Sequence, residues 1–367
     1  MVVKKITIKG FRNYELSEAD FSEGVNILLG KNGQGKTNLL EAIFYLTSGR
    51  SFKTRYDRET INFNRENAAI ESLICSDGRE QKLSVKLSRL QKKELWANGV
   101  RMRTTSDFAG RLTAVMFSPE DLYMIKEGAA ARRRLMDMCI SQLRPRYVSL
   151  LTEYNRIYEN KTRILRDWRV KPALLDTLDD FSRQLALRGA ELIHYRAHFS
   201  KKLSRAAGEI HRDFSGGAEQ LDIIYRTVKT VSDPLAKPSE IFPRLLEHQE
   251  AHRRAEIESG LCLSGAHKDD LEILINGSPA RSFASQGQTR TAALSIKLAE
   301  RRIHFEDRGE YPVLLLDDVL SELDCMRRDF VINHISNGQV FITCCEDVGN
   351  LGKTGAKFLH IDCGSIV

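Results

Sequence analysis

The stretch Gly30-Lys31-Asn32-Gly33-Gln34-Gly35-Lys36-Thr37 matches the pattern G-x-x-x-x-G-K-[ST] in full. It follows an apolar run at 25–29, which predicts a buried strand, and it precedes a helical pattern at 38–44. In such a loop, glycines let backbone N–H groups surround a phosphate, and the N-terminus of the following helix adds a favourable dipole. The stretch therefore predicts an ATP-binding loop. All of its residues, together with Asn38, are expected to contact the nucleotide.

The chemistry at this loop is expected to come from a few side chains. Lys36 would reach the β- and γ-phosphate oxygens, and the Thr37 hydroxyl would bind Mg²⁺. The apolar run 313–316 ends in Asp317 and Asp318. Asp317 is placed to hold Mg²⁺, directly or through water, and Asp318 to position or deprotonate the attacking water. Paired aspartates after a strand can also be a surface turn, but the nearby phosphate loop favours the catalytic interpretation.

A third motif, at 283–288, precedes another helical pattern. A small hydroxyl residue, a glycine and the open N–H groups of a helix start can bind an anion without a lysine. Ser285, Gly287 and Gln288 are therefore further candidates for phosphate contacts. A single phosphate loop needs no second anion site, whereas a dimer in which each chain caps the other's nucleotide does. Taken alone, Ser-x-Gly at a helix start is as often simply a helix cap.

The composition limits the class of protein. The chain has 367 residues, with 56 Lys+Arg against 49 Asp+Glu, a net charge of +7 and a pI near 9.0. It has no apolar run of the roughly 20 residues that a membrane span needs, and no signal-peptide pattern. Its seven cysteines are odd in number and form no C-x-x-C pair, so buried, reduced thiols are expected. These features predict a soluble cytoplasmic protein without membrane partners.

The order of patterns predicts an α/β fold interrupted by helices. Strand patterns occupy most of the first part of the chain, with a hairpin turn at Asn98-Gly99, and a helical texture runs from Ser118 to about 258. Strand patterns return at 271–275, 313–316 and 340–342. We expect a P-loop ATPase domain formed by residues 1–117 and 265–367, with a mainly helical lobe at 118–264 inserted between the two parts.

These motifs occur in the order found in the head of an ABC-type ATPase, with Ser321-Glu322-Leu323-Asp324 following the aspartate pair. In detail the chain resembles the RecF family, bacterial recombination mediators of the SMC-like group. The resemblance runs from residue 3 to beyond 345 and includes further segments. These are Phe11-Arg12-Asn13-Tyr14, Gly49-Arg50-Ser51-Phe52-Lys53-Thr54, Phe117-Ser118-Pro119-Glu120-Asp121-Leu122, Arg132-Arg133-Arg134 and Gly265-Ala266-His267-Lys268-Asp269-Asp270.

The resemblance implies roles for particular residues. ATP would drive head-to-head dimerisation, with Ser285 and Gly287 of one chain on the γ-phosphate held by the other. Arg12 and Asn13 would flank the nucleotide. Glu120 would correspond to the Q-loop, and Asp324 would belong to the D-loop that crosses the dimer interface.

The resemblance also implies a function and a hydrolysis rate. The dimer would bind double-stranded DNA near single-stranded gaps and help to load RecA, together with RecO and RecR. Asp318 stands where ABC heads usually carry Glu, so a weak, DNA-stimulated ATPase is expected. Lys268 stands where RecF proteins commonly have arginine, and Thr343-Cys344 lies where many ABC ATPases have a switch histidine.

Basic residues gather in two places that are candidates for DNA contacts. Residues 126–172 contain 12 Lys+Arg and 5 Asp+Glu, so 12 − 5 gives +7, and Arg132, Arg133 and Arg134 lie within them. A second group, Arg50, Lys53 and Arg55, follows the helix after the phosphate loop. Contacts to the DNA backbone would be independent of base sequence and sensitive to salt. The alternative for the first group is a solvated helical face with salt bridges.

Three other classes of P-loop protein fit the chain less well. A transporter ATPase subunit would need a surface for coupling to membrane helices, and a structural SMC protein would need hundreds of residues of coiled coil. A small-molecule kinase would leave the motif at Ser285 unexplained.

Overall fold

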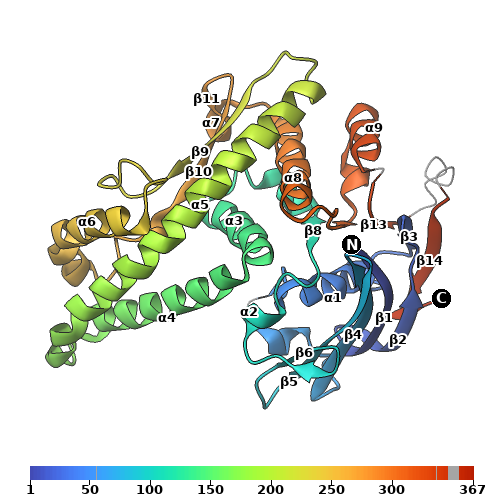
Figure 1. The fold of residues 1–367 in the computed structure, drawn as a ribbon, viewed down its shortest axis with the longest axis horizontal. Coiled ribbons are helices and arrows are strands. Elements are labelled where there is room, and N and C mark those ends of the chain that lie inside the picture. Colours follow the sequence, from blue (N-terminus) through green and yellow to red (C-terminus); the bar gives the residue numbers. More distant parts are fainter. Residues whose placement is uncertain (55, 336, 346–354) are drawn as a thin grey trace. The chain divides into compact units, whose positions relative to one another are not determined.

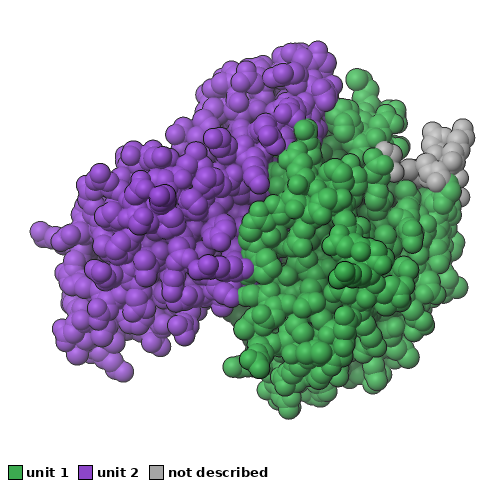
Figure 2. All heavy atoms as spheres, in the orientation of Figure 1, with its two compact units in different colours: residues 1–123, 141–145, 290–367 green, residues 124–140, 146–289 purple. Residues whose placement is uncertain are grey.

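The computed structural model describes residues 1–54, 56–335, 337–345 and 355–367. The chain divides into two compact units, coloured separately in Figure 2. Unit 1 consists of residues 1–123, 141–145 and 290–367, and unit 2 of residues 124–140 and 146–289. The segment 265–289, which we expected to belong to the ATPase domain, therefore packs with unit 2.

Unit 1 contains an antiparallel sheet of six strands in the order β2-β1-β4-β5-β6-β7. Their bounds are β1 (Val2–Phe11), β2 (Tyr14–Asp20), β4 (Asn67–Ser76), β5 (Arg79–Ser88), β6 (Glu94–Ala97) and β7 (Val100–Arg101). In β1, Ile6 and Ile8 are fully buried and alternate with more exposed polar residues, as the period of a half-buried strand requires. The turn between β6 and β7 has positive φ at Asn98 (49°) and Gly99 (76°), which confirms the expected hairpin.

The second sheet of unit 1 is mainly parallel and has the order β15-β14-β3-β13-β12-β8. Its strands are β3 (Val25–Leu29), β8 (Ala114–Phe117), β12 (Val313–Leu316), β13 (Val340–Cys344), β14 (Lys357–Asp362) and β15 (Ser365–Ile366). The central strands β12 and β13 are buried along their whole length, which explains their continuous apolar sequence. Because β3, β12 and β13 are parallel and in register, their carboxyl ends lie at one edge of the sheet.

Helix α1 (Lys36–Ser48) contacts strands of both sheets and is buried on almost every face (Figure 1). Its first two residues, Lys36 and Thr37, are the last two of the phosphate-loop motif. Unit 1 also contains the helices α2 (Thr105–Phe108), α9 (Cys325–His334) and most of α8 (Gln286–Arg308). The short 3₁₀ helices among the described residues are η1 (Asp57–Thr60), η2 (Pro119–Tyr123), η3 (Pro172–Thr177), η4 (Ala266–Lys268) and η5 (Val319–Glu322).

Unit 2 is mainly helical, as the sequence predicts. Its helices include α3 (Ala129–Leu143), α4 (Pro145–Asp167), α5 (Leu178–Phe214), α6 (Pro238–Ser259) and α7 (Ala280–Phe283). The aromatic and leucine stripe of α4 packs inward, with Tyr147, Tyr154 and Leu165 at most 2% exposed. Unit 2 also contains a small sheet of order β11-β10-β9, of which we expected only the strand at 271–275. It joins β10 (Asp270–Ile275) to β11 (Ser278–Pro279) and to β9 (Leu221–Arg226), whose pattern we did not recognise.

The segment Ala266–Asp270 has a structural role in unit 2. Arg196 donates to Asp269 at 2.8 Å and to Asp137 at 3.0 Å, and the Tyr225 hydroxyl donates to the same Asp269 carboxylate at 2.5 Å. Burial raises the pKa of Asp269, and the Arg196 charge opposes that shift. A buried charge is tolerated only when it is paired and hydrogen-bonded, so this cluster holds α3, α5, β9 and the start of β10 together.

Three further expectations can be checked against the fold. All seven cysteines are free thiols, although Cys325, Cys345 and Cys363 are exposed, so our expectation of burial was wrong for them. The helical texture that we expected from Ser118 starts only with the short helix η2, before which Ser118 donates to Asp121, and the first α-helix of this region, α3, begins at Ala129. In the part of the chain that the structure describes, no helix combines the length and apolarity needed to cross a membrane.

Candidate nucleotide-binding site

The phosphate loop links the end of β3 to the start of α1, at the sheet edge where β12 and β13 also end. Gly35 has φ of 118°, a conformation that favours glycine, and a Cβ at this position would lie 2.7 Å from Asn13 Nδ2. Lys36 is buried, and its ammonium donates to the carbonyl oxygens of Gly30 (2.5 Å) and Lys31 (3.1 Å). The first two carbonyl groups of the loop therefore hold the Lys36 ammonium group.

Opposite the loop, a network of hydroxyl and carboxylate oxygens surrounds Asp317. Its Oδ1 accepts hydrogen bonds from the hydroxyls of Thr37 (2.7 Å) and Thr343 (3.1 Å). Burial raises the pKa of Asp317, while the Thr37 hydrogen bond and the Lys53 charge oppose that shift. A threonine hydroxyl beside a carboxylate is a donor set that suits Mg²⁺, which prefers hard oxygen ligands. The residues present therefore fit the metal that we expected here.

Asp318 is held by its backbone at the same edge. Its φ is 54°, its amide donates to Thr343 Oγ1 at 2.8 Å, and its carboxylate accepts from Ser321 Oγ at 3.2 Å. The structure thus brings Lys36, Thr37, Asp317 and Asp318 together around a pocket of about 240 Å³. The residues lining this pocket are Asn32, Gly33, Gly35, Lys36, Thr37, Asn38, Lys53, Asp317, Asp318 and Thr343.

Lys53 also lines this pocket, although sequence analysis made it a candidate for DNA contacts. We expected it to contact DNA, but its ammonium acts electrostatically on Asp317 and its side chain lines the phosphate-loop pocket. The segment after α1 therefore folds back towards the nucleotide site. Lys53 thus adds an exposed cation to the buried Lys36 in a pocket that suits a polyanion.

Lys53→Ala is expected to weaken ATP binding about tenfold, because a charge-assisted contact to a phosphate contributes roughly 1.5–3 kcal/mol, reduced here by exposure to solvent. Fluorescence titration with a labelled ATP analogue measures the effect. Lys92→Ala, which removes an exposed lysine far along the sequence from the loop, is the matched control. Unchanged ATP affinity together with weakened DNA binding would restore the original assignment.

Arg12 and Asn13, which we expected to flank the nucleotide, support the phosphate loop and α1 through hydrogen bonds. Asn13 donates to the Gln34 carbonyl at 2.8 Å and accepts from Asn38 Nδ2 at 2.9 Å. Arg12 forms a bidentate pair with the buried carboxylate of Glu41, at 2.9 and 2.8 Å. Among the described contacts, Arg12 and Asn13 thus fix the loop and α1, and a contact to the nucleotide itself stays a prediction.

The C-terminal hairpin also supports the loop, a contact that no pattern in the sequence indicates. Gly364 donates its amide to the Gln34 carbonyl at 2.9 Å, and Cys363 donates its amide to Gln34 Oε1 at 2.6 Å. A Cβ at Gly364 would lie 2.2 Å from the Asn13 carbonyl oxygen. Residues more than 300 positions away in the chain therefore set the shape of the phosphate loop.

Two other expected site residues are exposed and do not line this pocket as the structure describes it. Glu120 lies in η2, and Asp324 caps α9 by accepting from the Arg327 amide at 2.9 Å. The Arg327 amide and side chain lower the pKa of Asp324. Their assignment to the Q-loop and D-loop stays a prediction.

The third motif starts α8 in unit 2. Ser285 Oγ accepts from the Gln288 amide at 3.2 Å, while Gln288 Oε1 accepts from the Ser285 amide at 2.9 Å. This reciprocal pair is a capping box, which fixes the helix start. Ser285 is exposed, and Gly287 follows it in the first turn of α8. The capping interpretation is thus correct, and it leaves an exposed helix N-terminus that can also receive an anion.

The expected DNA contacts divide into different classes. Arg132 is 3% exposed and forms a bidentate pair with Asp270 at 2.7 and 2.9 Å, so it has a structural role; its burial disfavours the DNA contact, which stays a prediction. Arg133 is half-buried and donates to the Asp269 carbonyl at 2.6 Å. Arg50 and Arg134 are exposed, and Arg55 lies outside the described residues.

Arg132→Ala is expected to lower the free energy of unfolding by about 3 kcal/mol, because it leaves Asp270 without its partner and frees three carbonyl oxygens of the 124–127 turn. The melting temperature of the full chain, followed by circular dichroism, measures this loss. Arg134→Ala, at an exposed neighbouring position, should change it little. Equal stability of the two variants would contradict the structural role of Arg132.

A phosphate loop, a strand-end aspartate pair, a helix-capping signature and an inserted helical lobe together define an ABC-type ATPase head of the SMC-like kind. The family model described as "RecF/RecN/SMC N terminal domain" matches residues 2–351. The DNA replication and repair protein RecF of Clostridioides difficile (strain 630) is 39% identical over 346 residues, which cover 94% of this chain and 92% of that protein. The RecF of Lactobacillus johnsonii (strain CNCM I-12250 / La1 / NCC 533) is 39% identical over 371 residues, covering 100% and 99%.

A solved structure of the recombination mediator protein RecF with ATPrS, from the RecFOR pathway, superimposes with a TM-score of 0.91. It is 33% identical and covers 100% of this chain and 97% of that one. An Smc head bound to the C-winged helix domain of ScpA has a TM-score of 0.55 at 17% identity, covering 100% and 97%, and shows the fold alone. The chain therefore belongs to the RecF family, and it is an ATP-binding ATPase with the expected fold.

Proposed function

We propose that this chain is a recombination mediator that binds double-stranded DNA as an ATP-dependent dimer. The observation that carries the proposal is the pairing of two incomplete phosphate sites in one chain. One is the lysine-bearing loop with its Thr37–Asp317 pair, and the other is the exposed helix start at Ser285, which has no lysine. In two chains arranged head to head, the helix start at Ser285 of one chain would complete the nucleotide site at the phosphate loop of the other.

Each residue of the site would have a separate role in ATP hydrolysis. Lys36 would bind phosphate oxygens, and Thr37 and Asp317 would hold Mg²⁺, which supplies charge neutralisation on the phosphates when bound. Asp318 would accept the proton of the attacking water. Because its carboxylate is one methylene shorter than that of Glu, we propose slow hydrolysis that resets the dimer, with ATP binding as the switch. Such a switch works only if ATP favours the dimer over the monomer.

The family relationship supports the rest of the proposal. Relatives named as DNA replication and repair proteins, and a recombination mediator RecF of the RecFOR pathway, support a role on DNA with RecO and RecR as partners. Double-stranded DNA near gaps as the ligand, and RecA as the protein to be loaded, are part of our proposal. Arg50 and Arg134 stay candidates for contacts to the DNA backbone, and Arg133 a weaker one.

The test is the mass in solution by light scattering, without nucleotide, with ADP–Mg²⁺ and with ATP–Mg²⁺, each with and without a short DNA duplex. A doubling of protein mass only with ATP, together with retained DNA, is the expected result. A monomer under every condition that still hydrolyses ATP would contradict the proposal and indicate an ordinary P-loop enzyme.

A further inference from the structure

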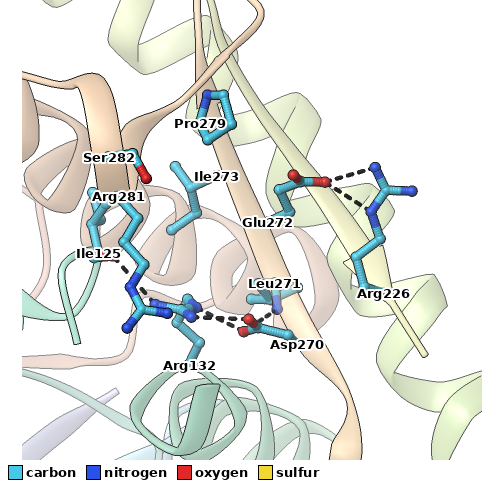
Figure 3. Close-up of a pocket in the computed structure, with 10 residues that line it drawn as sticks. All are labelled: Ile125, Arg132, Arg226, Asp270, Leu271, Glu272, Ile273, Pro279, Arg281 and Ser282. Atoms are coloured by element: carbon cyan, nitrogen blue, oxygen red, sulfur yellow. Dashed lines mark hydrogen bonds and ion pairs between the residues drawn. The ribbon is translucent and has the colours of Figure 1, made fainter. Parts of the chain in front are cut away.

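A second polar pocket, of about 320 Å³, lies wholly within unit 2 and is shown in Figure 3. Its floor is apolar and comes from Ile125, Leu271, Ile273 and Pro279. Three arginines and two carboxylates complete the lining together with Ser282. The charged residues are Arg132, Arg226, Arg281, Asp270 and Glu272.

The charges of this pocket are unequally matched. Arg132 pairs with Asp270 at 2.7 Å, and Arg226 pairs with Glu272 at 2.6 Å. Within the part of the chain that the structure describes, no carboxylate pairs with Arg281, which is exposed. Figure 3 shows the ion pairs of Arg132 with Asp270 and of Arg226 with Glu272, and it labels Arg281 among the residues that line the pocket. Three positive charges against two negative ones leave one cation for an incoming anion.

The segment that carries Arg281 is fixed in place by another cation. The Lys126 ammonium donates to the carbonyl oxygens of Ala280 (3.4 Å), Arg281 (3.2 Å) and Ala284 (3.0 Å). These carbonyls lie in and just after the short helix α7. The contact orients α7 and adds a positive charge near the pocket, so the local field favours an anionic group.

The backbone beside the pocket is the partly open edge of a sheet. Strand β9 covers one side of β10 from Asp270 to Ile275, whereas on the other side β11 covers only Leu274 and Ile275. The part of β10 that lines the pocket, Asp270–Ile273, therefore has no neighbouring strand on that side in the described sheet. The Leu271 amide already donates to Asp270 Oδ1 at 2.7 Å, so pairing with an extended peptide through main-chain hydrogen bonds would use the other backbone groups of this edge.

We propose that this pocket binds an acidic, extended segment of a partner protein. A carboxylate side chain of the segment pairs with Arg281, an apolar side chain packs on Ile125 and Ile273, and the segment backbone runs along the free part of β10. DNA fits the pocket less well, because the carboxylates of Asp270 and Glu272 line it and because its floor is apolar. This inference stands independently of the ATP-gated dimer, since all of its residues lie in unit 2.

The test uses the full chain and a fluorescein-labelled octapeptide of alternating glutamate and valine, with binding followed by anisotropy. The control peptide has lysine in place of each glutamate, and a labelled short DNA duplex forms a second arm. Arg281→Glu is expected to weaken binding of the glutamate peptide about tenfold or more, because a charged contact is replaced by repulsion. The matched variant Arg254→Glu, on the exposed surface of α6, should leave it unchanged.

Ser282→Glu provides an independent variant, since it adds a carboxylate to the pocket while Arg281 stays in place, and it should weaken the same peptide. Circular dichroism confirms that each variant is folded. The proposal is overturned if the wild-type chain does not bind the glutamate peptide, if the lysine peptide binds equally well, or if Arg281→Glu does not weaken the glutamate peptide. Loss of duplex binding without loss of peptide binding would instead identify the pocket as a DNA contact.

Discussion

Lys36→Met is expected to lower ATP affinity about 100-fold or more and to abolish every ATP-dependent property of the chain. Lys36 is the buried cation of the phosphate loop, and its ammonium is held at the loop mouth by the carbonyl oxygens of Gly30 and Lys31. Each charge-assisted hydrogen bond that it makes to phosphate would contribute roughly 1.5–3 kcal/mol, so the loss of two gives an effect of this size. Isothermal titration with ATP–Mg²⁺ measures the affinity, and light scattering measures the dimer.

The control for this variant lies in the same loop. Lys31→Met removes the same charge from an exposed side chain five residues earlier, while the Lys31 carbonyl stays available to Lys36. It should reduce ATP affinity only a few-fold, because exposed charge contacts contribute about 0–1 kcal/mol. If the two variants bind ATP equally, Lys36 is not the phosphate lysine and the proposed site is wrong.

Ser285→Asp is expected to abolish ATP-dependent dimerisation while leaving the fold and ATP binding by the monomer intact. Aspartate caps a helix start as well as serine does, so the capping interaction with the Gln288 amide can be kept. Its carboxylate would, however, repel the γ-phosphate that the partner chain presents. The mass in solution with ATP–Mg²⁺ and the ATP affinity are measured on the same sample.

Ser285→Thr keeps both the cap and the neutral hydroxyl, and it should dimerise as the wild-type chain does. Normal dimers of Ser285→Asp would show that this helix start does not receive a phosphate. A loss of ATP binding in the same variant would mean that Ser285 acts on the nucleotide of its own chain. This result would also contradict the proposal that Ser285 contacts the nucleotide held by the partner chain.

The parts of the site that sequence predicted correctly are those in which neighbouring residues act together. The phosphate loop, its strand and its helix are continuous in the chain, and the glycine conformations that they require are encoded at the positions themselves. The aspartate pair was predicted for the same reason, since it follows its own buried strand directly. Parallel pairing then brought Asp317 to within 2.7 Å of Thr37, as the shared sheet edge implied.

The features of the site that the sequence did not indicate depend on contacts between distant segments. Arg132 looked like one of three equivalent arginines, but a helix buries one face, and only the fold could show that Asp270 lies opposite Arg132. Strand β9 escaped recognition because it is a single short strand within a helical region and depends on β10 for its pairing. Lys53 lies after the end of α1, where no local pattern fixes the direction of the chain.

The sequence by itself thus determined that this is an RecF-like ABC ATPase with an inserted helical lobe, because local motifs and hydrophobic periodicity carry that information. Only the tertiary structure decided which cations line the phosphate-loop pocket, which are buried in ion pairs, and which segments support the loop. Lys53 beside Asp317, Arg132 on Asp270 and Gly364 against Gln34 each join segments far apart in the chain. The charge and size of a side chain determine which groups it can bind. The packing of the whole chain determines which of those groups lie close enough to be bound.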